Sequence, residues 1–330
     1  MNSYILIKGI GSIGRRHVNN LILLGYTKLV LVSTNDSIAS DFPSLQHART
    51  LTEAFNKFPI SHVIISSPTS HHIPDLQAVL NLGAKHIYLE KPVSHSLAQI
   101  KETEDLIKKN KALVIVGFDL HYDPGINRLR EWINQGLIGR VLSANAFVGQ
   151  HLKQWRPYED YRKGMSASIA QGGGVLLDLV HEFDYLRWIL GEPERVGSLT
   201  QHNQCMEIET EDLVDVLIRF KDQVNVSIHL DYHQRKLIRN CIFTGEHGSI
   251  YWDLAERQCK LINNEGETSI FDYQNFERNE RYLAIMKNFI ALHEDERLTT
   301  FTEGLTSLKM VQAAKESAKS QTFISLTNMN

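Results

Sequence analysis

The sequence predicts two domains: a doubly wound α/β domain with a parallel sheet, then an α+β domain with a large, mainly antiparallel open sheet. In the first third of the chain, short apolar runs alternate with patterns of helical period, as in strands joined by crossover helices. After about residue 119, several strand-like runs follow one another and alternate apolar with polar residues, which is typical of an antiparallel sheet with one covered face. A length of 330 residues suits two domains, and we place them at 1–120 and 121–330.

The first domain is predicted to begin with a βαβ unit. "YILIKG" has the composition of a buried strand, "IGRRHVNNLILL" has helical spacing and ends before Gly25, and "KLVLVS" is the next strand. The alternation continues with helices at 51–58, 74–82 and 97–110 and strands at 62–67, 86–90 and 113–118. This order predicts a parallel sheet whose strand ends form a ligand-binding edge.

The second domain is predicted to combine a helix-rich start with a run of strands. A helix at 124–136 precedes a strand at 141–150, a polar aromatic loop and an apolar helix at 172–186. Further strands are expected at 212–220, 223–233, 238–245 and 248–254, and helices near 279–293 and 303–319. We find no internal repeat and no low-complexity segment.

Composition and charge exclude several classes of protein. The formal net charge is -3 and the basic residues are spread along the chain, so we expect no nucleic-acid partner. The longest apolar runs are far shorter than the roughly 20 residues of a membrane span, and the N-terminus begins a strand rather than a signal peptide. Cys205, Cys241 and Cys259 have neither metal-type spacing nor the number needed for a disulfide framework. These observations predict a cytoplasmic protein with no metal and no membrane contact.

The stretch "GIGSIG" predicts a dinucleotide site. Gly9, Gly11 and Gly14 fit G-x-G-x-x-G directly after a strand and at the start of a helix, the context in which this motif binds a pyrophosphate. A glycine turn that binds nothing is the alternative. The second strand ends in "STN" rather than in a carboxylate, so NAD and NADP both stay open, with a slight preference for NADP that Arg15 and Arg16 would serve.

Two further loops are predicted to meet at this edge of the sheet. "YLEKPVS" places Glu90, Lys91 and Pro92 at the end of one strand, and "SSPTSHH" ends the preceding strand. Because both loops follow carboxyl ends of parallel strands, they should flank one crevice. A lysine that merely caps a strand in solvent is the alternative for Lys91.

The stretch "GGGVLLDLVHEFDYL" raises a question of burial. As a helix it is apolar nearly all the way round, yet it carries Asp178, His181 and Asp184. Burying unpaired charge is expensive, so these groups either face a cavity or form an internal network, for instance between Asp184 and Arg187.

Taken in order, these motifs strongly resemble the Gfo/Idh/MocA family of nicotinamide-dependent oxidoreductases. The set comprises "GIGSIGRRH", "SSPTSHH", "LEKPVS", "VGFDLHYDPGINRLREWINQGLIGRV" and "GGGVLLDLVHEFDYL", and it spans essentially the whole chain. The resemblance implies an N-terminal Rossmann domain and a C-terminal α+β domain whose open sheet mediates homodimers or homotetramers. It also implies bound NAD or NADP and oxidation or reduction of a hydroxyl-bearing carbon of a sugar, a cyclitol or a sugar nucleotide.

The resemblance also implies the site residues. Lys91 would reach nicotinamide and substrate, His181 would be the general acid/base, and Asp178 would orient His181 or bind a neighbouring hydroxyl. The family more often has the histidine four positions after the aspartate. Here it comes three after, which leaves the role of Asp178 open although both spacings lie on one helix face. Glu182 and Asp184 are expected to be structural. The expected cofactor-binding residues are Gly9, Gly11, Ser12, Ile13, Gly14, Ser33, Thr34, Ser67, Pro68, Thr69, His72, Glu90 and Lys91.

The substrate end is predicted in the aromatic and basic loop 149–168. We assign Trp155, Arg156, Tyr161 and Arg162 to the substrate, because an aromatic face stacks on a sugar and arginine matches phosphate or carboxylate. A subunit interface would have the same composition. The loop resembles family members of bacterial surface-sugar pathways, which favours an activated or acidic sugar.

These observations predict an NAD(P)-dependent dehydrogenase or reductase that acts on a CH–OH group. A dinucleotide-binding sensor or co-regulator of the same fold would need neither Lys91 nor His181, and an NAD-assisted glycosidase stays open.

Overall fold

The computed structural model describes residues 3–155, 157 and 160–329, and its chain forms two compact units. The first consists of Met1–Asp119 and Arg278–Leu305, and the second of Leu120–Glu277 and Thr306–Asn330. The chain therefore changes unit near residue 120, and the segment 278–305, which we expected in the second domain, belongs to the first unit. Among the described residues, no helix has the length and apolar character needed to cross a bilayer.

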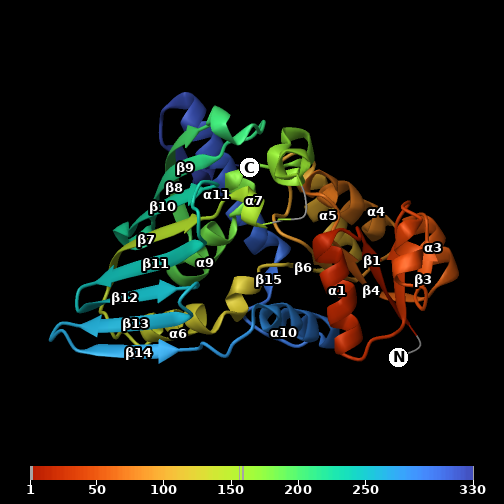
Figure 1. Ribbon diagram of the computed structural model, residues 1–330, viewed down its shortest axis with the longest axis horizontal. Helices are drawn as coiled ribbons and strands as arrows, with labels where there is room; N and C mark the ends of the chain where they lie inside the picture. Colours follow the sequence, from red (N-terminus) through yellow and green to blue (C-terminus); the bar gives the residue numbers. More distant parts are fainter. Residues whose placement is uncertain (1–2, 156, 158–159, 330) are drawn as a thin grey trace. The chain divides into compact units, whose positions relative to one another are not determined.

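The first unit is built on a seven-stranded sheet with the order β15-β6-β5-β4-β1-β2-β3. Figure 1 labels β15, β6, β4, β1 and β3 of this sheet. Its strands pair in parallel except β15, which joins β6 antiparallel. The strands are β1 (Tyr4–Lys8), β2 (Leu29–Val32), β3 (Gln46–Ala48), β4 (Ile60–Ile65), β5 (His86–Leu89), β6 (Leu113–Val116) and β15 (Thr299–Thr300). The predicted Rossmann-type parallel sheet is confirmed.

In the part of the chain that the structure describes, the helices beside this sheet are α1 (Ser12–Leu23), α2 (Ser37–Asp41), α3 (Leu51–Lys57), α4 (His72–Asn81), α5 (Ile100–Asn110) and α10 (Arg278–Ala291). The last of these packs on α1, which explains why residues 278–305 return to this unit. The contact includes a paired amide, in which Asn279 Nδ2 donates to Asn20 Oδ1 at 2.8 Å. It also includes Arg16, whose guanidinium lies 4.6 Å from the ring centre of Tyr282.

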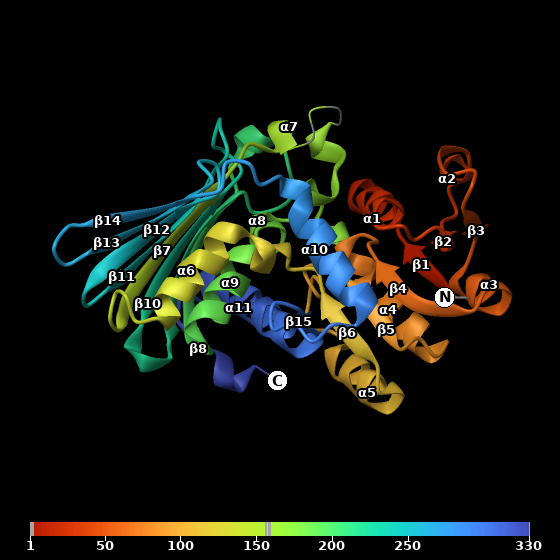
Figure 2. The same cartoon turned by 90° about the horizontal axis from the view of Figure 1, so that it is seen from below.

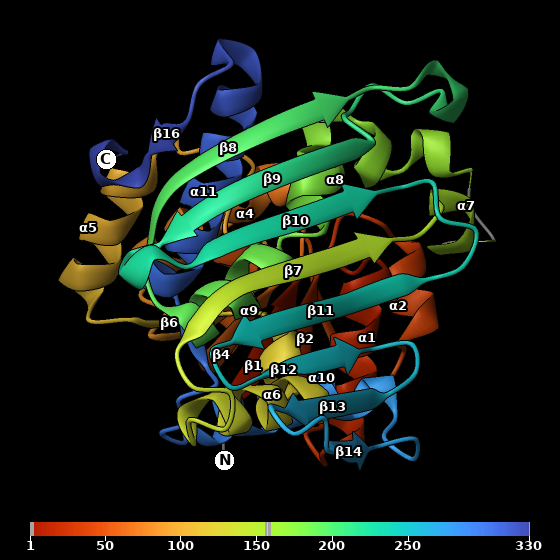
Figure 3. The same cartoon turned by 90° about the vertical axis from the view of Figure 1, so that its left-hand side faces the viewer.

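The second unit contains a nine-stranded sheet with the order β14-β13-β12-β11-β7-β10-β9-β8-β16 (Figure 3). All neighbours pair antiparallel except β10 and β7, so the predicted mainly antiparallel sheet is confirmed. The strands are β7 (Val141–Gly149), β8 (Pro193–Gln201), β9 (Leu213–Phe220), β10 (Asn225–Asp231), β11 (Ile238–Gly245), β12 (Gly248–Asp253), β13 (Gln258–Asn263), β14 (Thr268–Asp272) and β16 (Ile324–Ser325).

Helices cover one face of this sheet (Figure 2). They are α6 (Pro124–Asn134), α8 (Val175–Asp178), α9 (His181–Leu190) and α11 (Phe301–Ser320), and α7 (Leu152–Trp155) follows β7. Burial alternates along β10 because only one face of the sheet is covered by helices. Val226, Ile228 and Leu230 are buried, while Asn225 is exposed. The remaining regular segments are 3-10 turns at Thr69–His71, Asp119–Tyr122, Tyr161–Lys163, Met165–Ala167, Ile169–Gln171, Gln204–Met206, Lys221–Gln223 and Leu326–Asn328.

The prediction of a single helix over 172–186 is wrong, because this segment forms two short helices. The segment α8 ends at Asp178 and α9 begins at His181. Glu211 receives the N-terminus of α8, since its carbonyl accepts from Val175 N at 3.1 Å and its carboxylate from Leu176 N at 3.4 Å. Acidic residues in the first turn of α9 favour a new helix start there, because they complement the positive end of the helix dipole.

Candidate functional site

The glycine-rich loop between β1 and α1 fits a dinucleotide. A Cβ on Gly14 would lie 2.0 Å from the carbonyl oxygen of Gly9, so helix and loop approach each other only because residue 14 is glycine. Gly9 has a φ of +89°, and a Cβ there would meet Ser67 N at 2.3 Å. A Cβ on Gly11, in contrast, would meet no atom within 4 Å beyond its own chain neighbours. This open space at the start of α1 is what a pyrophosphate needs.

The end of β2 holds the residues that would meet the adenosine ribose. Ser33 is half-buried and accepts a hydrogen bond from Asn35 N, and Thr34 is exposed. Asp36 pairs with Arg49 at 2.6 Å, and Arg15 pairs with Asp41. The charge of Arg15 is therefore compensated inside the unit, which weakens the argument from this residue for a 2′-phosphate.

The E-K-P loop is anchored to the glycine-rich helix. Glu90 Oε1 lies 2.6 Å from Nε2 of His17, whose side chain is fully buried on α1. The other carboxylate oxygen accepts from the backbone N–H of Lys91 at 3.3 Å. The carboxylate that precedes Lys91 is thus held by the helix that follows the predicted cofactor turn.

The two loops predicted to flank one crevice are joined through His72. Its Nδ1 lies 2.7 Å from the carbonyl oxygen of Pro92, and its Nε2 lies 2.9 Å from that of Ser67. Burial lowers the pKa of His72, whereas the two carbonyl oxygens, which only accept hydrogen bonds, favour the ring with a proton on both nitrogens. Because His72 and Glu90 are 1% and 6% exposed, both suit a supporting role better than wide contact with a ligand.

The second unit holds the predicted substrate-side pair on successive helices. Asp178 is half-buried, and the hydroxyl of Tyr232 donates to its Oδ2 at 2.7 Å. Burial, with the nearby Asp178 carboxylate, raises the pKa of Tyr232, so the phenol stays protonated and remains a donor. His181, 7% exposed, opens α9. Tyr232 was not found from the sequence, where it is one more aromatic residue at a strand end.

The other acidic residues of this region form internal ion pairs, as expected for structural groups. Glu182 makes two hydrogen bonds of 2.8 Å with Arg239. Asp184 lies 2.8 Å from Nε2 of His121, a partner that the sequence did not suggest. Arg187 contacts Glu192 at 3.0 Å.

The predicted substrate loop is only partly described. The Trp155 ring meets the Tyr232 ring edge-on, with 5.6 Å between centres, and Tyr161 meets His151 in the same way at 5.8 Å. Arg162 is bound by Asp160 at 2.8 Å and Glu207 at 2.6 Å, and these two carboxylates raise its pKa. Arg156 lies outside the described residues.

A cavity of about 460 Å³ opens beside Arg162 within the second unit. Its walls mix two cations and two carboxylates with small polar residues, so no charge dominates. The lining residues are Arg162, Lys163, Gly164, Ala167, Ser168, Gln171, Glu207, Ile208 and Glu209.

The fold and the glycine-rich loop define the class of this protein as one with a dinucleotide-binding Rossmann domain. A family model described as "Oxidoreductase family, NAD-binding Rossmann fold" matches residues 4–118, and one described as "GFO/IDH/MocA C-terminal domain" matches residues 126–251. The chain belongs to the Gfo/Idh/MocA family, which confirms the resemblance drawn from its motifs. It is an NAD(P)-dependent enzyme.

Relatives of similar length support this assignment. The chain is 25% identical to a myo-inositol 2-dehydrogenase of Thermotoga maritima and 25% identical to an inositol 2-dehydrogenase of Rhizobium meliloti, in each case over 96% of this chain and 97% of the relative. Among solved structures, it resembles a levoglucosan dehydrogenase in complex with NADH and levoglucosan, with a TM-score of 0.86 and 19% identity over 99% of this chain and 100% of that one. An oxidoreductase of Agrobacterium radiobacter in complex with NAD+, L-tartaric acid and magnesium has a TM-score of 0.83 at 16% identity, with 100% of both chains covered. At these identities the structural similarities concern the fold.

Proposed function

We propose that this enzyme oxidises or reduces a hydroxyl-bearing carbon of a neutral cyclitol or sugar with NAD or NADP. The observation that carries the choice of substrate is the charge balance around Arg162 in the predicted substrate loop. Arg162, the described arginine that we assigned to the substrate, is already bound by two carboxylates. A ligand with many hydroxyl groups suits such mixed donors and acceptors, whereas a diphosphate would meet Glu207 and Glu209. The inositol and levoglucosan dehydrogenases among the relatives agree with this class.

The roles that we propose follow from the chemistry of the side chains. The cofactor, when bound on the residues after β1, β2, β4 and β5, supplies or accepts the hydride. His181 takes the proton of the reacting hydroxyl, because an imidazole exchanges protons near neutral pH. Lys91 places a cation beside the reacting oxygen and stabilises its developing negative charge. Asp178, held by Tyr232, orients His181 or accepts from a neighbouring hydroxyl.

The experiment begins with native mass spectrometry of the full chain, which tests for retained NAD or NADP. The redox state of the nicotinamide is then followed while myo-inositol, scyllo-inositol, levoglucosan, glucose and a nucleoside-diphosphate sugar are added in turn. Turnover of one of the neutral compounds supports the proposal. Turnover of the nucleotide sugar alone would move the substrate to the activated sugars of surface-polysaccharide synthesis. A bound cofactor that no compound changes favours a sensor, and product release without net cofactor change favours a glycosidase.

Variants test the roles of the residues. Replacing Lys91 with alanine should lower kcat by about two orders of magnitude or more while the dissociation constant for NAD changes little. Lys101→Ala is the matched control, because Lys101 is exposed on α5 and pairs with Asp105, one turn further along the same helix. His181→Asn should lower kcat in the same way. An unchanged kcat in the Lys91 variant would remove the proposed role.

We further propose that a second copy of this chain docks on the uncovered face of the nine-stranded sheet. Apolar side chains point outward there, with Leu199 74%, Leu217 55% and Ile270 57% exposed. This proposal rests on the family resemblance and on those residues. Sedimentation of Leu217→Glu against wild type is the test, and an unchanged particle mass would contradict it. A cytoplasmic location agrees with the three free cysteines.

A further inference from the structure

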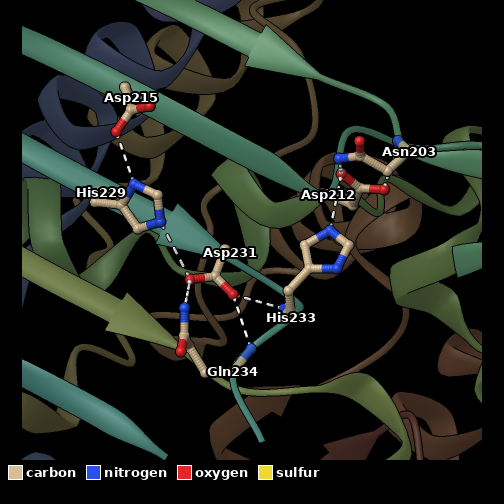
Figure 4. A network of polar contacts seen from close by, with 7 residues as sticks. All are labelled: Asn203, Asp212, Asp215, His229, Asp231, His233 and Gln234. Atoms are coloured by element: carbon tan, nitrogen blue, oxygen red, sulfur yellow. Dashed lines mark hydrogen bonds and ion pairs between the residues drawn. The ribbon is translucent and has the colours of Figure 1, made fainter. Parts of the chain in front are cut away.

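A buried carboxylate at the end of β10 organises three separate segments of the second unit. Asp231 is 0% exposed and accepts four hydrogen bonds (Figure 4). Its Oδ1 accepts from the backbone N–H groups of His233 at 2.5 Å and Gln234 at 3.0 Å. Its Oδ2 accepts from Gln234 Nε2 at 2.9 Å and lies 3.2 Å from His229 Nε2. A carboxylate has about four acceptor positions, so these contacts fill it and lock the turn after β10.

The turn held by Asp231 positions Tyr232. The backbone N–H of Tyr232 donates to the carbonyl of Asp212 at 2.9 Å, and its hydroxyl donates to Asp178. His233, on the other side of Tyr232, lies 3.3 Å from the Asp212 carboxylate (Figure 4). Successive residues of a strand point to opposite faces, so Asp231 faces outward where Tyr232 faces the helices. The direction of the Asp178 carboxylate therefore depends on contacts made on the far side of the sheet.

The same network reaches the N-terminus of α8. Asp212 is fully buried and also accepts from the backbone and side chain of Asn203, at 2.7 and 2.8 Å. The preceding residue, Glu211, receives the first N–H groups of α8, the helix that ends at Asp178. Both the helix that carries Asp178 and the hydroxyl that binds it are thus tied to one set of contacts.

Asp231 also contacts the strand that leads into the predicted substrate loop. Gly149 pairs with Asp231 in the sheet, and a Cβ at position 149 would lie 2.4 Å from the Oδ2 of Asp231. His151 N donates to the carbonyl of Gln234 at 2.9 Å. The chain continues through α7 to Trp155, whose ring meets Tyr232. Glycine at 149 therefore lets the substrate loop lie directly against the Asp231 turn.

On the outer face, His229 bridges two carboxylates. Its Nδ1 lies 2.7 Å from Asp215 on β9, its Nε2 contacts Asp231 on its own strand, and its ring stacks on Phe147 of β7 at 4.5 Å. Asp215 and Asp231 are the titratable groups in contact with the ring among the described residues. Both partners are carboxylates, which only accept hydrogen bonds. The two contacts are therefore both hydrogen bonds when each ring nitrogen of His229 carries a proton. No group of three or more His, Cys, Asp and Glu side chains in the described ranges is arranged to hold a metal ion.

We propose that Asp231 is a positioning residue for the Asp178 end of the site, and that the protonated ring of His229 holds it, which makes substrate binding pH-dependent. This inference rests on the proposed function for its effect on substrate, while the positioning itself is independent of it. The hydrogen bonds to Asp231 and Asp215 raise the pKa of His229. Because the pKa of His229 is raised by folding, the stabilisation that its protonated ring gives to the folded state is complete below the pKa of an unfolded histidine, about 6.5. It is lost as pH rises through the higher folded value.

The first experiment needs no substrate. Incorporation of 5-fluorotryptophan labels the four tryptophans, and Trp155→Phe assigns the resonance of residue 155. In wild type this resonance should shift with a midpoint above pH 6.5. His229→Gln should remove the shift, and Asp215→Asn should lower its midpoint. His247→Gln is the control and should leave it unchanged. His151, just before α7, is a further titratable ring in this segment, and burial with Arg235 lowers its pKa, so its step falls at lower pH.

The second experiment measures backbone hydrogen exchange and kinetics in the full chain. Asp231→Asn should raise exchange in residues 149–155 and 231–235 and raise KM about tenfold or more with a smaller change in kcat. His229→Gln, a milder variant, should show the same KM at neutral pH as wild type shows at high pH. Unchanged exchange in Asp231→Asn, or a wild-type pH step in His229→Gln, overturns the positioning role. If no compound of the panel is turned over by any variant, exchange and fluorine spectra still decide it, and only the proposed function fails.

Discussion

Replacing Gly11 with alanine adds one methyl group and tests cofactor binding separately from folding. The φ of Gly11 is -77°, a value that alanine adopts readily, and nothing lies within 4 Å of the position of a Cβ. Gly11→Ala should therefore change the free energy of unfolding of the cofactor-free chain by no more than about 0.5 kcal/mol. The methyl group would instead enter the space that we assign to the pyrophosphate.

The expected loss of affinity follows from the hydrogen bonds that the backbone would no longer make. A hydrogen bond to a charged group contributes about 1.5–3 kcal/mol, and each 1.4 kcal/mol is about tenfold in affinity. The dissociation constant for the dinucleotide should therefore rise about ten- to hundredfold. Gly14→Ala is the contrasting variant, because its Cβ would lie 2.0 Å from the Gly9 carbonyl oxygen. It should destabilise the first unit by about 1–3 kcal/mol through overpacking.

Isothermal titration calorimetry with NAD and with NADP measures the affinity, and thermal unfolding without cofactor measures the stability. We expect Gly11→Ala to unfold like wild type and bind weakly, and Gly14→Ala to unfold at a lower temperature. Wild-type affinity in Gly11→Ala would refute the placement of the pyrophosphate at this turn. A lowered melting temperature in that variant would contradict the reading of open space.

Three further predictions concern other parts of the molecule. Tyr232→Phe removes the donor to Asp178 and should lower kcat/KM about ten- to hundredfold with unchanged NAD affinity. Tyr251→Phe, on the outer sheet face, is the control and should have no effect. Equal activities of the two variants would contradict the role of the Tyr232 hydroxyl. Arg239→Met leaves Glu182 buried without its bidentate partner and should lower the free energy of unfolding, measured in urea, by about 3–5 kcal/mol. Arg140→Met breaks an exposed ion pair and should lower it by about 0–1 kcal/mol. Similar losses in the two variants would refute the argument that burial makes the Arg239–Glu182 pair more important. Ser33→Asp places a carboxylate at the end of β2 and should shift the ratio of dissociation constants toward NAD, because it repels a 2′-phosphate; an unchanged ratio would show that the ribose lies elsewhere.

Local periodicity predicted most of the regular structure. It failed where an element is very short, or where its bounds depend on a residue far away in the sequence. The strand predicted at 28–33 corresponds to β2, and the helix at 303–319 to α11. The two-residue strand β15 and the three-residue β3 are too short to show a period. The start of α8 at Val175, inside the helix expected over 172–186, is bound by Glu211, more than 30 residues later in the chain.

The sequence by itself determined the family, the parallel sheet and the glycine turn, because each depends on residues close together in the chain. The spacing of Gly9, Gly11 and Gly14 is such a local signal, and the structure accounts for it atom by atom. Only the tertiary structure decided which polar groups support the site. His17 meets Glu90 across 73 positions and Tyr232 meets Asp178 across 54, and no local pattern contains either pair. Such partners are selected by the need to satisfy buried polar groups, and that need arises only once the strands and helices have packed.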